Sequence, residues 1–398
     1  MSAFQTLLGA LDSPEASQFT DSFLERVSVD TVVASVLNVH KRFGKPQAVH
    51  PIGDDLWQVQ SERGQYQVLA RFDQTHRLQA LRLPTPAVSP LKAKATFMVL
   101  LLMPLFFARS VVLSWSQPTL LAWLTDVLPS LIFGAALIAV SAWAQSATWL
   151  KPLFWLGMAM LALSSLRALH LPVGQLDGFD AVLSAVLVAA LLPLLLQGWR
   201  GRQIPRSIVE LGPVLAGGRF MVAQGGSTPT INYHVAHEHM RYAVDFIGVN
   251  AWGRHATGLL PADPEKYAIF GAEVLAPLSG QVVAARDGLP DLSIPQTDAL
   301  RPAGNHVVLR CLLSDGQTVQ VLLAHLKQGS VRVSPGDAVK AGEIIGQVGN
   351  SGNTTEPHLH LGVNRHTVEG DPFSGEGVPF SVEGRFPIRG MVYERQGA

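Results

Sequence analysis

A long apolar region in the middle of the chain limits the folds that this sequence can adopt. Residues 127–150 and 181–199 contain no charged side chain, and each is long enough to cross a hydrocarbon core of about 30 Å. Residues 95–115 and 153–171 are two weaker candidates, because each contains an arginine. The apolar core of a soluble domain is the alternative, which such long uncharged stretches disfavour. We therefore predict an α-helical transmembrane bundle of about four spans over residues 95–199.

The overall composition narrows the classes of partner and of metal site. Lys plus Arg and Asp plus Glu number 30 each in 398 residues, so the bulk charge does not favour a nucleic-acid partner. Cys311 is the single cysteine, which excludes an internal disulfide framework and a cysteine-rich zinc site. A metal bound by this chain would therefore be held by histidine and carboxylate side chains.

Residues 1–90 are predicted to form a small α+β module. Apolar side chains recur at near-helical spacing from Val29 to Phe43, and Gly44 is a plausible end for that helix. Apolar and polar residues alternate over residues 57–72 around a turn at 61–64, which is a hairpin pattern, and residues 77–84 add a third strand. No catalytic constellation is visible in this module, and its role is not assigned.

The composition changes abruptly after the apolar region. Residues 205–398 are predicted to form an all-β domain of antiparallel strands. Short β-prone runs such as NHVVLRCLL and TVQVLLAHL alternate with turns that contain glycine. Nine of the 13 histidines lie in this region: His234, His237, His239, His255, His306, His325, His358, His360 and His366.

The stretch EPHLHLG, residues 356–362, places two histidines one residue apart. Side chains two residues apart in a strand point to the same face, so His358 and His360 would share one side of a sheet. Leu359 and Leu361 would then be buried on the other side. The two imidazoles could bind a metal together, or one could bind it while the other transfers protons. A merely polar strand face is the alternative.

Two further polar side chains interrupt apolar stretches of this region. Asp245 lies in YAVDF, and His325 lies in LLAHLK. A buried carboxylate without a partner is costly, so Asp245 would either pair with a cation or point outward. Hydrolytic zinc sites take three protein ligands and leave one position open for water. The histidines of INYHVAHEHMRYAVDF, LLAHLKQGSV and EPHLHLG are therefore candidates for such a site.

The order of several motifs resembles that of a known family. VLAPLSGQVV, GNHVVL, AHLKQGSVRVSPGDAVKAGEIIGQVGNSGN and EPHLHLGV follow one another from about Gly271 to Val363, with NYH and RYAVDF ahead of them. This arrangement resembles the lysostaphin-type zinc metallopeptidases, the M23 peptidase family, which cut peptide bonds in bacterial cell-wall peptidoglycan. The resemblance implies that His234, Asp245 and His360 bind zinc.

The same resemblance implies that His325 and His358 flank the zinc-bound water. The chain departs from the family pattern in its first motif, where many members have His, three residues and then Asp. Here ten residues separate His234 from Asp245, and His237 and His239 lie between them. His234 is the favoured ligand, with His239 as the second choice and His237 as the third.

The function implied by the resemblance is zinc-dependent endopeptidase activity on peptidoglycan cross-links or bridges, by means of a metal-activated water. One alternative is a catalytically idle module that binds the wall or regulates other wall hydrolases. Another is a membrane-bound protease that cuts a protein substrate. The complete set of five residues favours an enzyme. A peptidoglycan peptide is the expected substrate, and a protein activator is a further candidate partner.

Such an enzyme is expected in the bacterial cell membrane, with its catalytic domain on the periplasmic or extracellular face. Four spans would place both soluble regions on one side, together with short basic flanks that the positive-inside rule assigns to the cytoplasm. A miscounted span, an exception to that rule or a signal sequence upstream of this start would remove the conflict, since the opening residues have no basic n-region. The basic flanks are Lys92, Lys94, Lys151, Arg200, Arg202 and Arg206.

Overall fold

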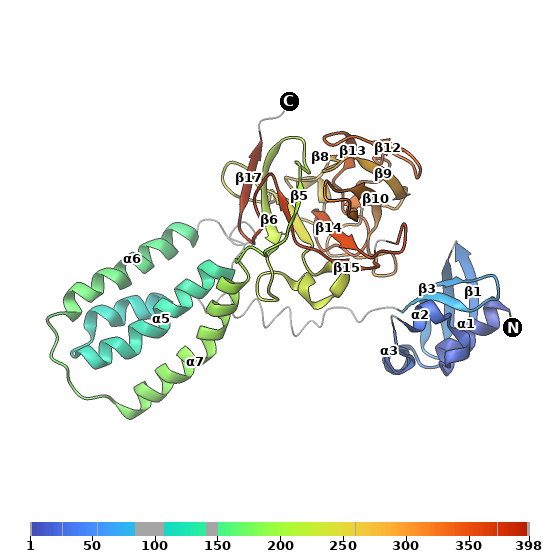
Figure 1. Cartoon of the computed structure of the whole chain (residues 1–398). Helices are drawn as coiled ribbons and strands as arrows, with labels where there is room; N and C mark the ends of the chain where they lie inside the picture. Colours follow the sequence, from blue (N-terminus) through green and yellow to red (C-terminus); the bar gives the residue numbers. More distant parts are fainter. Residues whose placement is uncertain are drawn as a thin grey trace. The chain divides into compact units, whose positions relative to one another are not determined.

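A computed structural model describes residues 2–25, 27–53, 55–83, 107–140, 150–258, 260–371 and 373–395. The chain divides into two compact units, Met1–Ser89 with Asp298–Pro302, and Pro90–Thr297 with Ala303–Ala398. The first unit contains the N-terminal module, and the second contains a group of apolar helices and a mostly β domain (Figure 1).

The N-terminal module is an α+β fold, as the sequence predicts. Its apolar side chains from helices and sheet form one core. Helix α3 ends at Gly44, whose φ of 76° lies in the left-handed region that glycine adopts readily. The predicted helix and hairpin are confirmed. The helices are α1 (Ala3–Asp12), α2 (Asp21–Leu24) and α3 (Val29–Phe43), and the antiparallel sheet has the order β1 (Pro46–Gly53), β2 (Leu56–Ser61), β3 (Gly64–Phe72) and β4 (Leu78–Arg82).

Strand β1 is an element that the sequence pattern did not predict. It contains Pro46 and Pro51, which argue against a strand because proline has no N–H for a ladder hydrogen bond. The structure places β1 at the edge of the sheet, paired with β2 alone. An edge strand tolerates proline, since one side of it makes no ladder hydrogen bonds.

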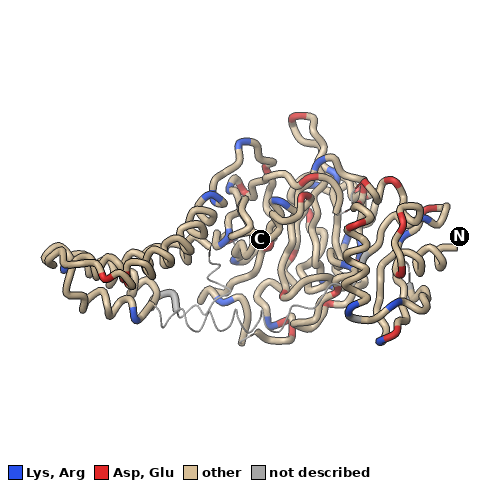
Figure 2. The backbone as a smooth tube through the Cα atoms, turned by 90° about the horizontal axis from the view of Figure 1, so that it is seen from below, with Lys and Arg blue, Asp and Glu red and all other residues tan. Residues whose placement is uncertain are grey.

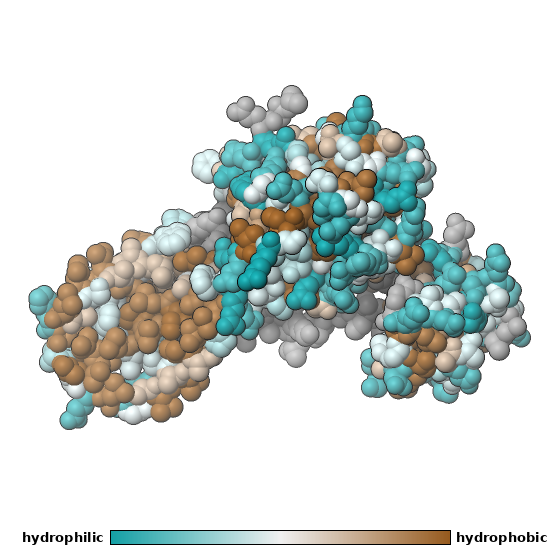
Figure 3. Space-filling model, in the orientation of Figure 1, coloured by the Kyte–Doolittle hydropathy of each residue, from teal (hydrophilic) through white to brown (hydrophobic). Residues whose placement is uncertain are grey.

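The apolar region forms a group of helices that lack charge over most of their length (Figure 2). Residues 107–116 are helical, and they are followed by α5 (Leu120–Val140), α6 (Leu150–Ala168) and α7 (Gly178–Arg200). The indole Nε1 of Trp123 on α5 donates a hydrogen bond to Ser164 Oγ on α6 at 3.0 Å. Apolar side chains make up most of the face of this group that is seen in Figure 3.

Within the described residues, two helices are long and apolar enough to cross a membrane, α5 and α7. The apolar part of α6, Pro152–Ala168, is shorter. Most of the first predicted span, 95–115, lies outside the described residues. The prediction of a four-span bundle is therefore not confirmed. The second span also begins earlier than predicted, because α5 starts at Leu120 and includes Asp126.

The C-terminal domain is mostly β, as predicted. Its main sheet has the order β12-β9-β10-β11-β14-β7-β6-β17, and β15 pairs with β14. The pairing is antiparallel except in the small sheet of β16 and β5, whose strands are parallel. The strands are β5 (Val209–Leu211), β6 (Gly218–Gln224), β7 (Val244–Gly248), β8 (Glu273–Leu275), β9 (Gly280–Arg286), β10 (Asn305–Leu312), β11 (Thr318–Leu326), β12 (Ala338–Val339), β13 (Ile344–Gln347), β14 (Leu359–Arg365), β15 (Glu376–Gly377), β16 (Phe380–Val382) and β17 (Val392–Arg395).

The two faces of the central strands have different roles. Leu359 and Leu361 on β14 are fully buried in the main apolar core. Phe246 on β7 is the partner of Leu359, and Val244 is the partner of Leu361. Because side chains alternate along a strand, His360 between the two leucines points to the opposite face. The packing of the core therefore determines which face of the sheet carries the polar side chains.

Candidate metal centre

Three adjacent strands place small and polar side chains at one point of the sheet. His360 on β14 lies opposite Asp245 on β7 and opposite Ala324 on β11. The alternation of side chains puts these three residues on the same face of the sheet. Ala324 leaves room for the imidazole of His360, and the next residue on β11 is His325.

His234 approaches the same point from a loop rather than a strand. It lies on the 3₁₀ helix η2 (Tyr233–Ala236), and the cap of that helix is the fully buried Asn232. The Asn232 side chain accepts a hydrogen bond from the N–H of His234 at 3.2 Å, and it donates to the carbonyls of Gly226 and Ala243 at 3.0 Å each. These bonds attach the segment that carries His234 to the start of β7.

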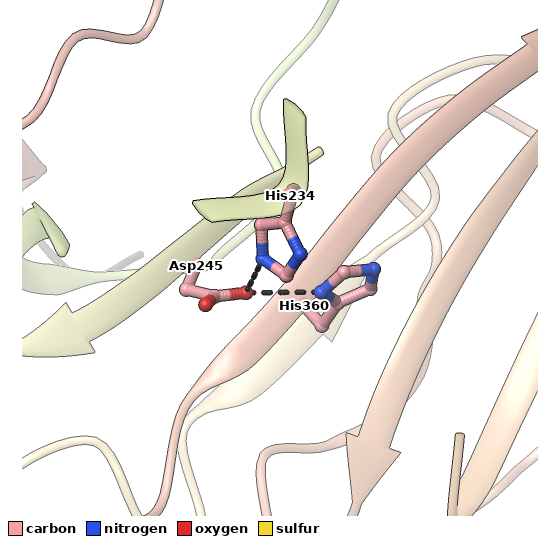
Figure 4. Close-up of side chains that lie close together, drawn as sticks. All are labelled: His234, Asp245 and His360. Carbon is pink, nitrogen blue, oxygen red and sulfur yellow. Dashed lines mark hydrogen bonds and ion pairs between the residues drawn. The ribbon is translucent and has the colours of Figure 1, made fainter. Parts of the chain in front are cut away.

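The ligand atoms of His234, Asp245 and His360 converge (Figure 4). Asp245 Oδ1 is 3.0 Å from His234 Nε2 and 2.9 Å from His360 Nδ1. One ligand atom from each residue lies within 4.8 Å of the other two, and all three residues are at most 5% exposed. The sequence left His237 and His239 open as replacements for His234, and the structure brings His234 to Asp245. His239 instead packs against the edge of Phe373, with ring centroids 5.9 Å apart.

Burial and neighbouring side chains shift the pKa values of Asp245, His360 and His325. Burial alone would raise the pKa of the Asp245 carboxyl, but the imidazoles of His234 and His358 and the hydrogen bonds to the carboxylate hold that pKa well below its usual range. Burial lowers the pKa of His360. Burial and the neighbouring imidazoles of His358 and His360 lower the pKa of His325 much further.

His325 and His358 form the second half of the site. Their ring centroids are 4.6 Å apart, and His358 Nε2 is 3.6 Å from Asp245 Oδ1. His325 Nδ1 donates to the carbonyl of Ser351 at 2.9 Å, and His358 Nδ1 donates to the carbonyl of Glu356 at 2.8 Å. Because a carbonyl can only accept, each neutral ring carries its proton on Nδ1, and Nε2 is left with a free lone pair. His325 has a φ of 63°, a strained conformation for a residue with a side chain.

Three residues that support the site were not identified as functional from the sequence. The Tyr233 hydroxyl donates to Asp245 Oδ2 at 2.9 Å, and the Tyr233 ring lies 4.2 Å from the ring of His234. Thr354 Oγ1 lies 3.0 Å from His358 Nδ1, and Ser351 supplies the carbonyl that orients His325. Their signal in the sequence was their position: Tyr233 lies within NYH, Ser351 lies within GNSGN, and Thr354 directly follows GNSGN.

The side chains present fit a bound zinc ion. Two imidazoles and one carboxylate are a common protein ligand set of catalytic zinc sites. Asp245 is anionic, and its Oδ2 is occupied by the Tyr233 hydroxyl, so Oδ1 remains for a cation. Three imidazole nitrogens lie within 3.6 Å of that oxygen. Such a convergence of lone-pair donors around one buried carboxylate oxygen is the arrangement that a cation would stabilise.

Several solved peptidase structures are similar to part of this chain. Among solved structures, the catalytic domain of lysostaphin from Staphylococcus simulans is 27% identical, and the match covers 34% of this chain and 74% of that one, with a TM-score of 0.21. A longer lysostaphin structure is 25% identical over 35% of this chain and 45% of that one, with a TM-score of 0.22. A zinc-containing peptidase from Vibrio cholerae is 21% identical over 41% and 37%, with a TM-score of 0.21.

The model of Peptidase family M23 matches residues 266–372. That range includes His325, His358 and His360, whereas His234 and Asp245 precede it. The match covers β8 to β14 and the loops between them, and it includes the HLH motif at the start of β14. Residues 266–372 of this chain are therefore a domain of peptidase family M23.

Proposed function

We propose that this chain is a zinc-dependent endopeptidase that hydrolyses peptide bonds in peptidoglycan cross-links or bridges. The observation that carries the proposal is the convergence of His234, Asp245 and His360 beside two further histidines. The match to the M23 family supports the reaction class. The resemblance of the sequence motifs to those of lysostaphin-type peptidases supports the substrate class.

In this proposal His234, Asp245 and His360 hold the zinc ion. Zinc at this site would act as a Lewis acid and lower the pKa of a bound water to about 7. Tyr233 keeps the Asp245 carboxylate oriented through its hydrogen bond to Oδ2. Nε2 and Nδ1 are the zinc-facing nitrogens of His234 and His360, because these atoms lie closest to Asp245 Oδ1.

His325 and His358 are proposed to move protons and to stabilise charge. In its neutral form each ring has its lone pair on Nε2, because its Nδ1 donates to a main-chain carbonyl. One of these nitrogens can take a proton from the attacking water and later return it to the departing amine. The protonated ring would also stabilise negative charge that develops on the substrate carbonyl oxygen.

The apolar helices are proposed to anchor the enzyme in the bacterial cell membrane. Ser184 and Gly198 are the buried residues of α7, and its leucines and valines are largely exposed, which suits contact with lipid rather than a soluble core. The catalytic domain would then face the periplasm or the cell exterior, where peptidoglycan lies. Reporter fusions at the C-terminus test this orientation, and a cytoplasmic C-terminus would contradict the peptidoglycan substrate.

The proposed function is tested by digestion of purified peptidoglycan. The full chain is loaded with zinc in detergent and compared with a His360→Ala variant and with a chelated sample. Release of muropeptides by the parent alone is the expected result. Zinc binding without any release would favour the idle binding module. Activity that survives both His360→Ala and chelation would overturn the assignment of the metal site.

A further inference from the structure

The segment that carries His234 is attached to the end of α7, one of the two candidate membrane helices. We call residues 225–234 the ligand strap, because they run from the end of β6 to His234. Helix α7 ends at Arg200, and Gly201 follows as its cap. The Gly201 carbonyl accepts a hydrogen bond from the N–H of Ser227 at 3.0 Å. The ligand strap therefore begins its course against the last turn of α7.

Two threonine hydroxyls extend this contact to Gln197, one turn before the end of α7. Thr228 Oγ1 donates to the Gln197 carbonyl at 2.9 Å, and Thr230 Oγ1 donates to the Gln197 side-chain oxygen at 2.7 Å. Both acceptors belong to one residue of α7. A shift or rotation of the helix end would break these bonds unless the ligand strap moved with it.

Close packing makes the contact intolerant of added atoms. Ile231 is fully buried, and its Cδ1 would lie 2.7 Å from a Cβ placed on Gly201, where Thr228 Oγ1 would be closer still. A Cβ on Gly226 would lie 2.7 Å from the Gly201 carbonyl oxygen. Gly201 has a φ of −63°, which any residue can adopt. A glycine suits this position because it has no side chain, and not because of its backbone freedom.

The ligand strap connects the close packing at Gly201 to His234, the candidate metal ligand. Ile231 is followed directly by Asn232, the buried cap whose side chain bonds to the N–H of His234. The same Asn232 amide donates to Gly226 O, which lies on the part of the ligand strap that packs on Gly201. A displacement at Gly201 therefore reaches His234 through two residues that are fully buried.

A second connection involves α5. The Arg202 guanidinium donates to the carbonyl of Ala139, near the end of α5, at 2.9 Å, and to the carbonyl of Arg389 at 3.5 Å. Arg389 in turn donates to the carbonyl of Thr230 on the ligand strap at 3.5 Å. The ends of both candidate membrane helices are thus connected to the same ten-residue segment.

We propose that the end of α7 positions His234, so that Gly201 and Gln197 are positioning residues of the metal centre and the membrane helices are mechanically coupled to it. The inference rests on the proposed zinc site. It assigns the helices a role beyond anchoring, because a change in the position of α7 would change the affinity of the site for zinc. Gly201 and Gln197 act through the ligand strap and touch neither metal nor substrate.

The test uses the full chain in detergent micelles and measures zinc affinity by competition with a chromophoric chelator. Gly201→Ala is expected to weaken zinc binding by roughly tenfold, as for other residues that orient metal ligands from outside the ligand set. Gly178→Ala is the matched control on the same helix, because a Cβ there meets no atom within 4 Å. Equal zinc affinities for the two variants would overturn the inference.

Gln197→Ala provides a milder second variant if Gly201→Ala does not fold. It removes the acceptor of Thr230 and keeps the helix, so a roughly threefold loss of zinc affinity is expected. Gln203→Ala is its control, since Gln203 is exposed and lies outside α7. A Gln197→Ala variant that binds zinc as the parent does would count against the coupling.

A structural defect would lower stability, whereas loss of positioning would change the metal site. The melting temperature of each metal-free variant and the visible spectrum of its cobalt-substituted form separate the two effects. The inference expects an altered cobalt spectrum in both variants, with an unchanged melting temperature in Gln197→Ala, and an unaltered spectrum overturns it. If the parent chain binds no zinc, the proposed function fails as well, and this outcome is distinguishable from an unaffected variant of a zinc-binding parent.

Discussion

Asp245 is the side chain on which the candidate site depends. It is 4% exposed, and its two oxygens are used differently. Oδ1 faces the imidazoles of His234 and His360, whereas Oδ2 accepts the hydroxyl of Tyr233. A buried carboxylate that lacks partners is costly, so each of these contacts contributes to keeping Asp245 in place and ionised.

Tyr233→Phe should weaken zinc binding by about tenfold, because a hydrogen bond that orients a metal-binding carboxylate would be lost. The phenyl ring can keep the packing of Tyr233 on His234. Chelator competition measures the zinc affinity. Tyr242→Phe is the control, because the hydrogen bonds to the Asp245 carboxylate in the described residues come from Tyr233, His234 and His360. An unchanged zinc affinity in Tyr233→Phe would show that Asp245 keeps its orientation without the hydrogen bond from Tyr233.

Thr354→Val should lower kcat and leave zinc affinity unchanged. The Thr354 hydroxyl lies between Asn350 Oδ1 and His358 Nδ1, and His358 is proposed to move protons rather than to hold the metal. We expect a fall in kcat of roughly tenfold, measured on peptidoglycan fragments. The exposed Thr355 offers Thr355→Val as a control. A loss of zinc affinity in Thr354→Val would mean that His358 belongs to the metal ligands.

At the scale of elements, two loops far apart in the sequence hold His325. The N–H of Asn305 donates to Ser351 Oγ at 2.9 Å, and Ser351 Oγ donates to the Leu326 carbonyl at 2.7 Å. The Asn305 amide also donates to the Leu326 carbonyl, at 3.1 Å. These hydrogen bonds join the GNH segment at the start of β10 and the GNSGN segment before β14 to each other and to the end of β11, where His325 lies. The sequence placed Asn305 in the motif GNHVVL and could not indicate this contact.

Gly304→Ala should destabilise the C-terminal domain by about 1–3 kcal/mol and lower its activity. Gly304 has a φ of 60°, and a Cβ there would collide with the carbonyl of Ser351, the residue that orients His325. Gly316→Ala is the control, since Gly316 has a φ of 81° and open space around it. Thermal unfolding of both variants measures the difference, and equal losses would mean that backbone strain alone is responsible.

In the whole molecule, the N-terminal module and the domain that carries the candidate metal centre have separate apolar cores. A ligand that binds the folded domain stabilises that domain by mass action. Because the three candidate ligands are all buried in the second unit, metal binding should stabilise this unit and leave the N-terminal module unaffected.

Removal of zinc should therefore lower the melting temperature of the C-terminal domain alone. Zinc at a thousand times its Kd contributes about 4 kcal/mol, which corresponds to a shift of roughly 10 °C for a domain of this size. Differential scanning calorimetry with and without chelator measures both transitions. A transition of the N-terminal module that moves equally would contradict the independence of the two cores, and His360→Ala should abolish the shift.

Local signals in the amino-acid sequence were enough to predict several elements of this protein. Alternation of apolar side chains predicted the hairpin of residues 57–72 and the strands around EPHLHLG, because a strand face repeats every second residue. The same alternation placed His358 and His360 on one side of a strand. Long uncharged stretches identified two helices that could span a membrane, while the weaker candidates, each with an arginine, remain unconfirmed.

Only the tertiary structure decided which side chains meet. Three histidines within six residues compete for one position beside Asp245, and a periodic pattern cannot choose among them because the segment forms short 3₁₀ turns rather than a strand. The buried cap Asn232 and the packing of Ile231 on Gly201 bring His234 to the carboxylate. Such contacts join residues that are distant in the sequence, so their geometry follows from how the core and the helix ends pack.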